Sequence, residues 1–124
     1  MKLFTLAEAN DILSVVRPKL ERLRRLSSRV NDLRDAARAA AAASGGGGGM
    51  ACGPAYVSML FDIHSIINYL GKLGIQLKDH MRGLIDFPSL RDGRVVLLCW
   101  QLGEPENIEC WHETEAGFAG RQPI

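Results

Sequence analysis

Hydrophobic spacing changes at Gly74, and this change constrains the fold more than any other feature of the sequence. Before Gly74, apolar residues recur in steps of three and four, which is the period of an α-helix. After Gly74, short runs rich in Val, Ile, Leu, Phe and Trp are separated by turn residues, as in β-strands. Helices followed by antiparallel strands define the α+β class. The 124 residues, 47% of them hydrophobic, give room for one domain, residues 1–124.

The first helix is predicted over residues 5–43. Thr5 and Glu8 have the spacing of a capping box, in which each side chain accepts a hydrogen bond from the other residue's backbone N–H. Pro18 removes a backbone hydrogen bond inside this helix and crowds the preceding turn, so we expect a kink near residues 15–16.

A second helix is predicted over residues 54–73, after an Ala/Gly-rich linker at 44–53 that contains five consecutive glycines. Pro54 suits its first turn. The first helix would be roughly 57 Å long and the second roughly 30 Å, so part of the first extends beyond its partner. An uncovered apolar stripe is normally matched by another surface, and we therefore expect a homodimer that pairs through the helices.

A small antiparallel β-meander of three to four strands is predicted over residues 75–113, followed by a tail at 114–124. Together with the long N-terminal helical hairpin it completes the predicted α+β fold. The expected strands are 84–88, 94–102 and 108–112, with a short fourth strand within 74–79, and the expected turns are 89–93 and 103–107.

The dipeptide Cys-Trp occurs twice, at 99–100 and 110–111. If Leu102 lies opposite Ile108 in an antiparallel pair, each cysteine faces the tryptophan of the other dipeptide. Because side chains alternate between faces, one Cys/Trp pair then lies on each side of the sheet. The two cysteines would be on opposite faces, which excludes a disulfide between them. We expect free thiols at all three cysteines, Cys52, Cys99 and Cys110.

Residues 95–100, Val-Val-Leu-Leu-Cys-Trp, show no alternation of polar and apolar side chains. A strand with one wet face would alternate, so both faces of the sheet are expected to be covered. The helices would cover one face. The other would be covered by the tail, by the long first helix or by a partner chain.

Several short motifs together resemble the bacterial domain of unknown function family numbered 2203. They lie at both ends of the chain and within the predicted sheet. They are Phe4-Thr5-Leu6-Ala7-Glu8-Ala9-Asn10, Lys78-Asp79, Gly83-Leu84-Ile85-Asp86-Phe87-Pro88, Cys99-Trp100-Gln101-Leu102-Gly103-Glu104, Trp111-His112 and Gly117-Phe118-Ala119-Gly120-Arg121. The resemblance covers nearly the whole chain. It implies a small bacterial cytosolic protein of helices followed by a sheet, and it implies no particular activity.

The polar residues of these motifs are the candidate ligand-binding residues, because their side chains are of types that bind a divalent metal or an anionic ligand. They are Asp79, Asp86, Glu104, His112 and Arg121, and the candidate metal ligands among them are His112, Asp86 and Glu104.

The predicted register sets how close the candidate metal ligands lie. It places Asp86 opposite Val96 and His112 opposite Leu98, on one face but on strands that flank the central one. Their Cα atoms would be roughly 12 Å apart, so a directly shared metal needs a register slip or a strong local twist. Hydrogen bonds of His112 and Arg121 that hold the tail against the sheet are the structural alternative.

The sequence contains none of the common hydrolase, phosphate-loop or dinucleotide motifs, so it identifies no reaction. The first interpretation is a self-associating binding or interaction module with a polar surface site for a small molecule or peptide. The alternative is a metal-assisted hydrolase or ligand-binding enzyme that uses Asp86, Glu104 and His112. No cofactor is evident, although a divalent metal would suit these residues.

Composition and charge pattern indicate which classes of partner and which cellular location to expect. Basic residues of the first helix are interleaved with acidic ones and lack aromatic neighbours, so nucleic acid is not expected as a partner. The sequence has no 18-residue apolar run and no signal-peptide pattern, which favours a soluble cytoplasmic protein without membrane contact.

Overall fold

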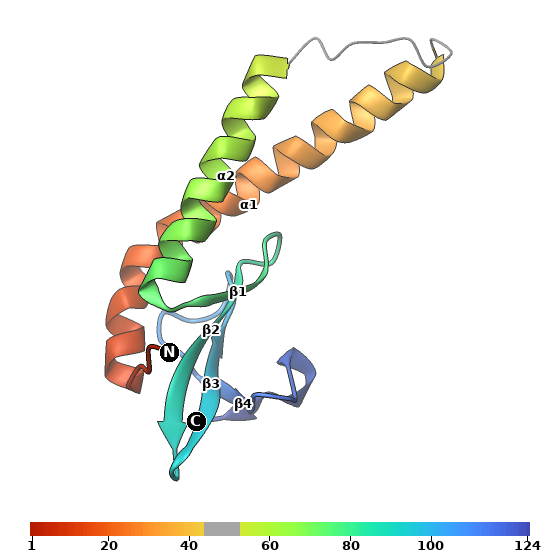
Figure 1. The fold of residues 1–124 in the computed structure, drawn as a ribbon. Helices are drawn as coiled ribbons and strands as arrows, with labels where there is room; N and C mark the ends of the chain where they lie inside the picture. Colours follow the sequence, from red (N-terminus) through yellow and green to blue (C-terminus); the bar gives the residue numbers. More distant parts are fainter. Residues whose placement is uncertain (44–52) are drawn as a thin grey trace.

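The computed structural model describes residues 1–43 and 53–124, which form two helices followed by a five-stranded sheet (Figure 1). The strands are all antiparallel and lie in the order β1-β2-β3-β4-β5. The elements are α1 (Leu6–Ala43), α2 (Gly53–Leu73), β1 (Gln76–Asp79), β2 (Leu84–Arg91), β3 (Arg94–Trp100), β4 (Cys110–Glu113), the short 3₁₀ helix η1 (Phe118–Gly120) and β5 (Gln122–Pro123). The predicted α+β class, helical hairpin and meander are confirmed, and β5 adds a strand within the predicted tail.

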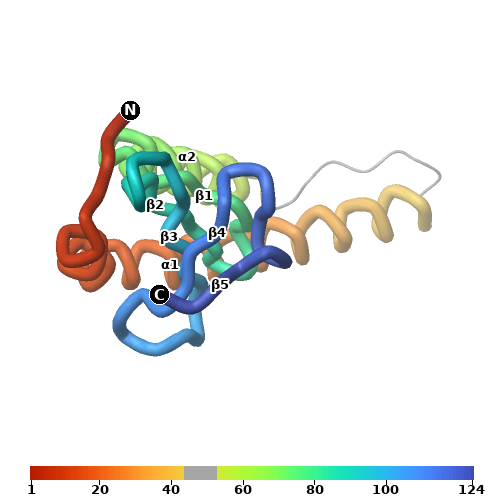
Figure 2. The backbone as a smooth tube through the Cα atoms, turned by 90° about the horizontal axis from the view of Figure 1, so that it is seen from below, coloured from red at the N-terminus to blue at the C-terminus, as the bar shows by residue number. Residues whose placement is uncertain are grey.

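α1 starts where the capping box predicts. Thr5 N–H donates to Glu8 Oε1 over 2.9 Å, and Glu8 N–H donates to Thr5 Oγ1 over 3.1 Å, so two N–H groups at the helix start have partners. Pro18 lies inside the helix. Figures 1 and 2 show the first turns of α1 running at an angle to the rest of the helix, as expected for a helix that contains proline.

The two helices differ in length as predicted, with 38 residues in α1 and 21 in α2. Val30 is the last buried residue of α1, and in Figure 1 the end of α1 extends away from α2. The predicted linker, 44–53, falls outside the described residues except for Gly53, which begins α2. No described helix is long and apolar enough to cross a membrane.

One face of the sheet packs against the helices and forms the main core. The buried core residues from the helices are Ala9, Leu13, Val16, Leu20, Leu23, Val30, Met59, Ile63, Ile66 and Leu70, and those from the sheet and the β3–β4 loop include Ile85, Phe87, Val96, Leu98, Trp100, Ile108 and Trp111. Trp100 and Trp111 therefore share this face, and the prediction that they lie on opposite faces is wrong.

The β2–β3 hairpin has a two-residue turn, Asp92-Gly93, in place of the predicted turn at 89–93. Both turn residues have positive φ, 52° at Asp92 and 78° at Gly93, as a type I′ turn requires. Arg91 pairs with Arg94 and Asp86 with Cys99. The predicted pairing of Asp86 with Val96 is wrong, because a longer turn was assumed where Asp-Gly makes a tight one.

The β3–β4 register also differs from the prediction. Cys99 lies opposite Cys110 and Leu98 opposite Trp111, one position from the expected pairing. The connecting loop is held by α1, since Asn10 Oδ1 accepts from Ile108 N–H at 2.8 Å and Arg17 donates to the Glu106 carbonyl at 3.2 Å. These anchors lie far away in the sequence.

The two cysteines are on the same face of the sheet, so the reason given for excluding a disulfide between them is wrong. Both are nevertheless free thiols, as predicted, and Cys52 lies outside the described residues.

The second face of the sheet is also buried, which confirms the expectation from the non-alternating run. Residues 84–89 of β2 and 96–100 of β3 are buried without interruption. Leu97 and His112 line a cavity on this face together with Gly117 and Phe118 from the C-terminal segment. The chain's own tail therefore covers part of the face turned away from the helices, and Figure 2 shows β5 running beside β4.

Candidate metal centre

Three side chains capable of binding a metal meet on the sheet face turned away from the helices. Asp86 comes from β2, Cys99 from β3 and His112 from β4, and strand pairing sets Asp86 directly opposite Cys99. Each residue is at least 98% buried. One ligand atom from each side chain lies within 4.8 Å of the other two. Three neighbouring strands thus bring an oxygen, a sulfur and a nitrogen donor to one point.

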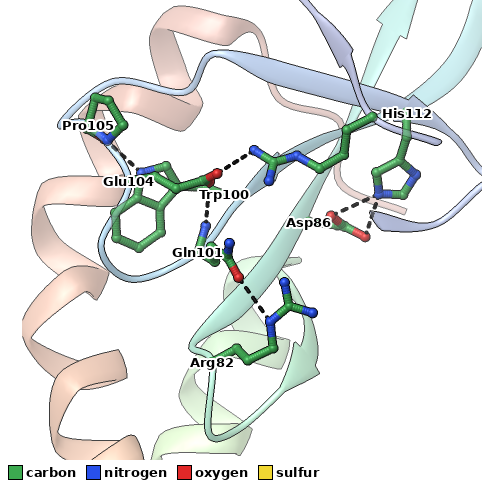
Figure 3. Close-up of polar contacts among 8 residues, drawn as sticks. Arg82, Asp86, Trp100, Gln101, Glu104, Pro105 and His112 are labelled. Atoms are coloured by element: carbon green, nitrogen blue, oxygen red, sulfur yellow. Dashed lines mark hydrogen bonds and ion pairs between the residues drawn. The ribbon is translucent and has the colours of Figure 1, made fainter. Parts of the chain in front are cut away.

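The hydrogen bonds of His112 define where its protons lie. Its Nδ1 is 2.8 Å from the backbone carbonyl of Glu113, which can only accept, so Nδ1 carries a proton. Its Nε2 is 3.1 and 3.2 Å from the two carboxylate oxygens of Asp86, and Figure 3 shows the two groups facing each other. Nε2 and the carboxylate therefore share a second proton, in the form of a buried imidazolium–carboxylate pair or its neutral equivalent.

Cys99 is held as a neutral thiol. The pKa of its thiol is raised to about 12, chiefly by burial and also by the negative charge of Asp86, which accepts a hydrogen bond from the thiol. A thiol with such a pKa is a poor nucleophile at neutral pH. Near neutral pH and without a metal, Cys99 is therefore a neutral thiol, and a bound cation would convert it to a thiolate.

A cavity of about 250 Å³ adjoins the three side chains. All three line it, together with Lys78 from β1, Thr114 after β4, and Gly117 and Phe118 from the tail; the apolar lining residues are Leu84 and Leu97. The cluster is thus not sealed within packed apolar atoms. An ion held by the three donors would have one side open to this space.

Glu104 of the β3–β4 loop and Arg121 of the tail form a second polar group. Arg121 Nη2 donates to Glu104 Oε2 at 2.6 Å, and Gln101 N–H donates to Glu104 Oε1 at 2.9 Å (Figure 3). Among the described residues Glu104 is outside the group of donors that meet at Asp86. The third ligand expected from the sequence is thus replaced in the structure by Cys99, while Arg121 ties the tail to the loop, as the structural alternative expects.

Asp79 also serves local structure. Its Oδ1 accepts hydrogen bonds from the backbone N–H groups of Met81 and Arg82, at 2.9 and 3.0 Å, and so stabilises the turn between β1 and β2.

The tail is also held by an aromatic contact at the edge of the cavity. Phe118 contacts two guanidinium groups, with Arg82 at 4.1 Å and Arg121 at 4.7 Å from its ring centroid. These cation–π contacts fix the tail at the edge of the cavity.

The sequence pattern placed Asp86 and His112 on one face, and the structure confirms this. We expected that a metal shared by both would need a register slip or a strong local twist. The registers do differ from the predicted ones, and His112 Nε2 lies 3.1 Å from an Asp86 carboxylate oxygen, with the strand of Cys99 between their two strands. Cys99 was missed as a candidate ligand. The Asp92-Gly93 turn was the signal that would have found it, since that turn sets Asp86 opposite Cys99.

Fold and cluster together define a small α+β protein in which a helical hairpin covers one face of an antiparallel meander and a His-Asp-Cys cluster lies on the other. Over residues 2–124 the chain matches the family described as "Uncharacterized conserved protein (DUF2203)", and it belongs to that family. Comparison with curated proteins gives no match, and comparison with solved structures gives none either.

Proposed function

We propose that this protein binds a divalent transition metal of the zinc type through Asp86, Cys99 and His112, and that the metal keeps one coordination position open towards the cavity. The observation that carries the proposal is the meeting of three different donor atoms, all buried and within 4.8 Å of one another, at the wall of one cavity. Three protein ligands with an open fourth position are typical of catalytic zinc sites, whereas structural sites use four.

The distances support this reading. Zinc ligands lie about 2.0–2.3 Å from the metal, so neighbouring donors in a tetrahedral site are roughly 3.3–3.8 Å apart. The 3.1 Å between His112 Nε2 and Asp86 is close to this value, and no pair in the group exceeds 4.8 Å. Side-chain shifts of about 1 Å would complete the geometry.

The surroundings of His112 also support a metal. A histidine that binds a metal through one ring nitrogen commonly donates the other N–H to a carbonyl or carboxylate, which orients the ring. Here the Nδ1–H group donates to the Glu113 carbonyl and turns Nε2 towards Asp86 and Cys99. The mixture of one sulfur, one nitrogen and one carboxylate suits Zn²⁺, and it disfavours Mg²⁺ and Ca²⁺, which prefer oxygen alone.

A cytoplasmic location is part of the proposal, because a reducing compartment keeps Cys99 available as a thiol. The hydrolase alternative uses the same centre, with a water in the open position and Cys99 in place of Glu104 as the third ligand. The cavity, at about 250 Å³, has space for that water and a small substrate.

Elemental analysis after dialysis against Zn²⁺ tests the proposal, with about one zinc per chain expected. The decisive variant is Cys99→Ala, which leaves the Asp86–His112 pair in place. It should weaken zinc binding by more than the roughly 10- to 100-fold that follows loss of an outer hydrogen-bond partner. Cys110→Ala is the matched control, since Cys110 lies opposite Cys99 on β4 but outside the group of donors.

Two outcomes would contradict the metal site. Wild-type protein that retains no zinc would leave the Asp86–His112 pair with a purely structural role. Equal zinc binding by Cys99→Ala and Cys110→Ala would show that the metal is held elsewhere. Circular dichroism of each variant establishes that the fold is intact before the comparison is made.

We also propose that two copies associate through the helices. Val57 and Phe61 lie one turn apart on α2 and are 64% and 69% exposed, and a second copy is the partner favoured because symmetric dimers are the commonest oligomers. Light scattering should give about twice the chain mass of 13.6 kDa, and Phe61→Ser should reduce that mass. Leu90→Ser, which changes an exposed apolar residue of the sheet, is the control. A wild-type mass equal to one chain would contradict the dimer.

A further inference from the structure

Beyond the three candidate metal ligands, the cavity has a polar rim drawn from two other segments. Lys78 comes from β1, and Thr114 and Gly117 come from the segment between β4 and η1. Lys78 and Thr114 are exposed, and neither makes a side-chain hydrogen bond or an ion pair with the described part of the chain. An ammonium and a hydroxyl are thus free to bind a ligand in the cavity.

The charge around the cavity favours an anion. Among the residues that the structure describes, Asp86 is the only acidic one that lines it, and the proton it shares with His112 offsets its charge. At the edge, Arg121 is paired with Glu104, whereas Arg82 makes its side-chain hydrogen bond to the neutral Gln101. Lys78 and Arg82 therefore contribute positive charge that no described acidic side chain at the cavity neutralises.

Metal binding at Asp86, Cys99 and His112 does not make the net charge at the cavity negative. A divalent cation with the Asp86 carboxylate and the Cys99 thiolate is neutral overall, so the positive charge of the rim determines what enters. Ligand pockets for drug-sized molecules measure about 300–1,000 Å³, and this cavity of about 250 Å³ accommodates only a smaller molecule.

We propose that the open coordination position takes one oxygen of a small oxyanion, a phosphate or a carboxylate, whose second oxygen binds the Lys78 ammonium. The inference rests on the proposed metal centre. Lys78 lines the same small cavity as the three proposed metal ligands, so a ligand with two oxygens on one phosphorus or carbon atom suits both the metal and the ammonium. Thr114 supplies a hydroxyl donor to the same ligand.

The test uses Co²⁺-loaded protein, because Co²⁺ replaces Zn²⁺ and its visible absorption reports the coordination geometry. Inorganic phosphate and acetate are the two probes, added separately at constant ionic strength. Each oxyanion that binds should change the visible bands and saturate, and the stronger response distinguishes phosphate from carboxylate. The sulfur-to-cobalt absorption should persist, since Cys99 stays bound.

Variants of Lys78 show whether the rim contributes. Lys78→Ala should weaken the anion response roughly tenfold or more, because it removes a charge-assisted hydrogen bond. Lys78→Arg should restore most of it, and Lys72→Ala, an exposed lysine of α2, should have no effect.

The possible failures are distinguishable. Absence of any sulfur-to-cobalt absorption overturns the metal centre and this inference with it. A normal cobalt spectrum that neither probe changes overturns the oxyanion site alone. Equal anion binding by Lys78→Ala and wild type, or by metal-free and Co²⁺-loaded protein, also overturns it, because the ligand would then not bridge the two groups.

Discussion

The charge balance at Asp86, Cys99 and His112 explains how one buried site could exist with and without a metal. Without a metal, the carboxylate, the thiol and the doubly protonated imidazole sum to zero. With a divalent metal, the carboxylate and the thiolate again offset the added charge. Because uncompensated charge is costly to bury, replacing two protons with one divalent cation is a favourable exchange.

This exchange predicts that zinc binding releases two protons, one from the His112–Asp86 pair and one from Cys99. Calorimetric titrations in buffers of different ionisation enthalpy count the protons directly. A variant that lacks the thiol, Cys99→Ala, should release one proton per zinc at concentrations where it still binds. Release of a single proton by the wild type would mean that Cys99 stays a thiol and is not a ligand.

Cys99 should also make the metal-free protein sensitive to alkali. Its pKa rises from 9.0 to about 12 on folding, chiefly through burial. Below about pH 9 both folded and unfolded chains hold the proton, so Cys99 gives no pH dependence. Between about pH 9 and 12 only the unfolded chain loses it, so the free energy of unfolding falls as pH rises. Denaturant unfolding across this range should show a steeper decline for wild type than for Cys99→Ala, and equal declines would contradict the raised pKa.

At the scale of the elements, the helices were predictable because their signals are local. Thr5 and Glu8 contact each other three residues apart, and the apolar spacing of α1 is visible in any window of its sequence. The first four strands and their order were predictable, but β5 and the registers were not. The β2–β3 register depended on recognising Asp92-Gly93 as a tight turn, a signal that the sequence does contain.

The β3–β4 register and the composition of the site depend on contacts that no local pattern contains. Asn10 and Arg17 of α1 hold the loop before β4, at sequence separations of 98 and 89 residues. The two registers together decide which residue lies between Asp86 and His112. The sequence therefore predicted two of the three clustered donors and their common face. The Asp92-Gly93 turn could have placed Cys99 opposite Asp86, whereas its place beside His112 required the assembled sheet.

The importance of the tight turn can be tested with a pair of glycines. Gly93 has φ of 78°, and a Cβ there would meet no atom within 4 Å, so Gly93→Ala adds conformational strain alone, about 1 kcal/mol or more. Gly71, in α2, is equally open but helical, so Gly71→Ala should stabilise by roughly 0.5–1 kcal/mol. Denaturant unfolding measures both changes. A neutral Gly93→Ala would mean that this turn does not need positive φ.

At the scale of the whole molecule, the two faces of the sheet differ in role. The face towards the helices carries both tryptophans and most of the apolar core. The other face carries the His-Asp-Cys cluster and its cavity beneath the C-terminal segment. Two contacts hold this segment in place: Arg121 pairs with Glu104 of the β3–β4 loop, and the ring of Phe118 contacts Arg82. A site built in this way needs the tail to be ordered, so its stability and its ligand binding should depend on the same covering contacts.

Leu97 and Leu98 test whether this outer face is buried by the chain itself. They are neighbours on β3 with side chains on opposite faces, and they are 5% and 6% exposed. Leu98→Ala leaves a cavity on the helix side and Leu97→Ala one on the tail side, so each should cost about 2–5 kcal/mol in the free energy of unfolding. Denaturant melts at several protein concentrations separate the two possible covers. If the tail covers Leu97, the loss in free energy of unfolding caused by Leu97→Ala is the same at every protein concentration. If a partner chain covers it, the stability of the protein rises with protein concentration. A cost below about 0.5 kcal/mol for Leu97→Ala would mark a wet face and would contradict both the buried outer face and the enclosed metal site built on it.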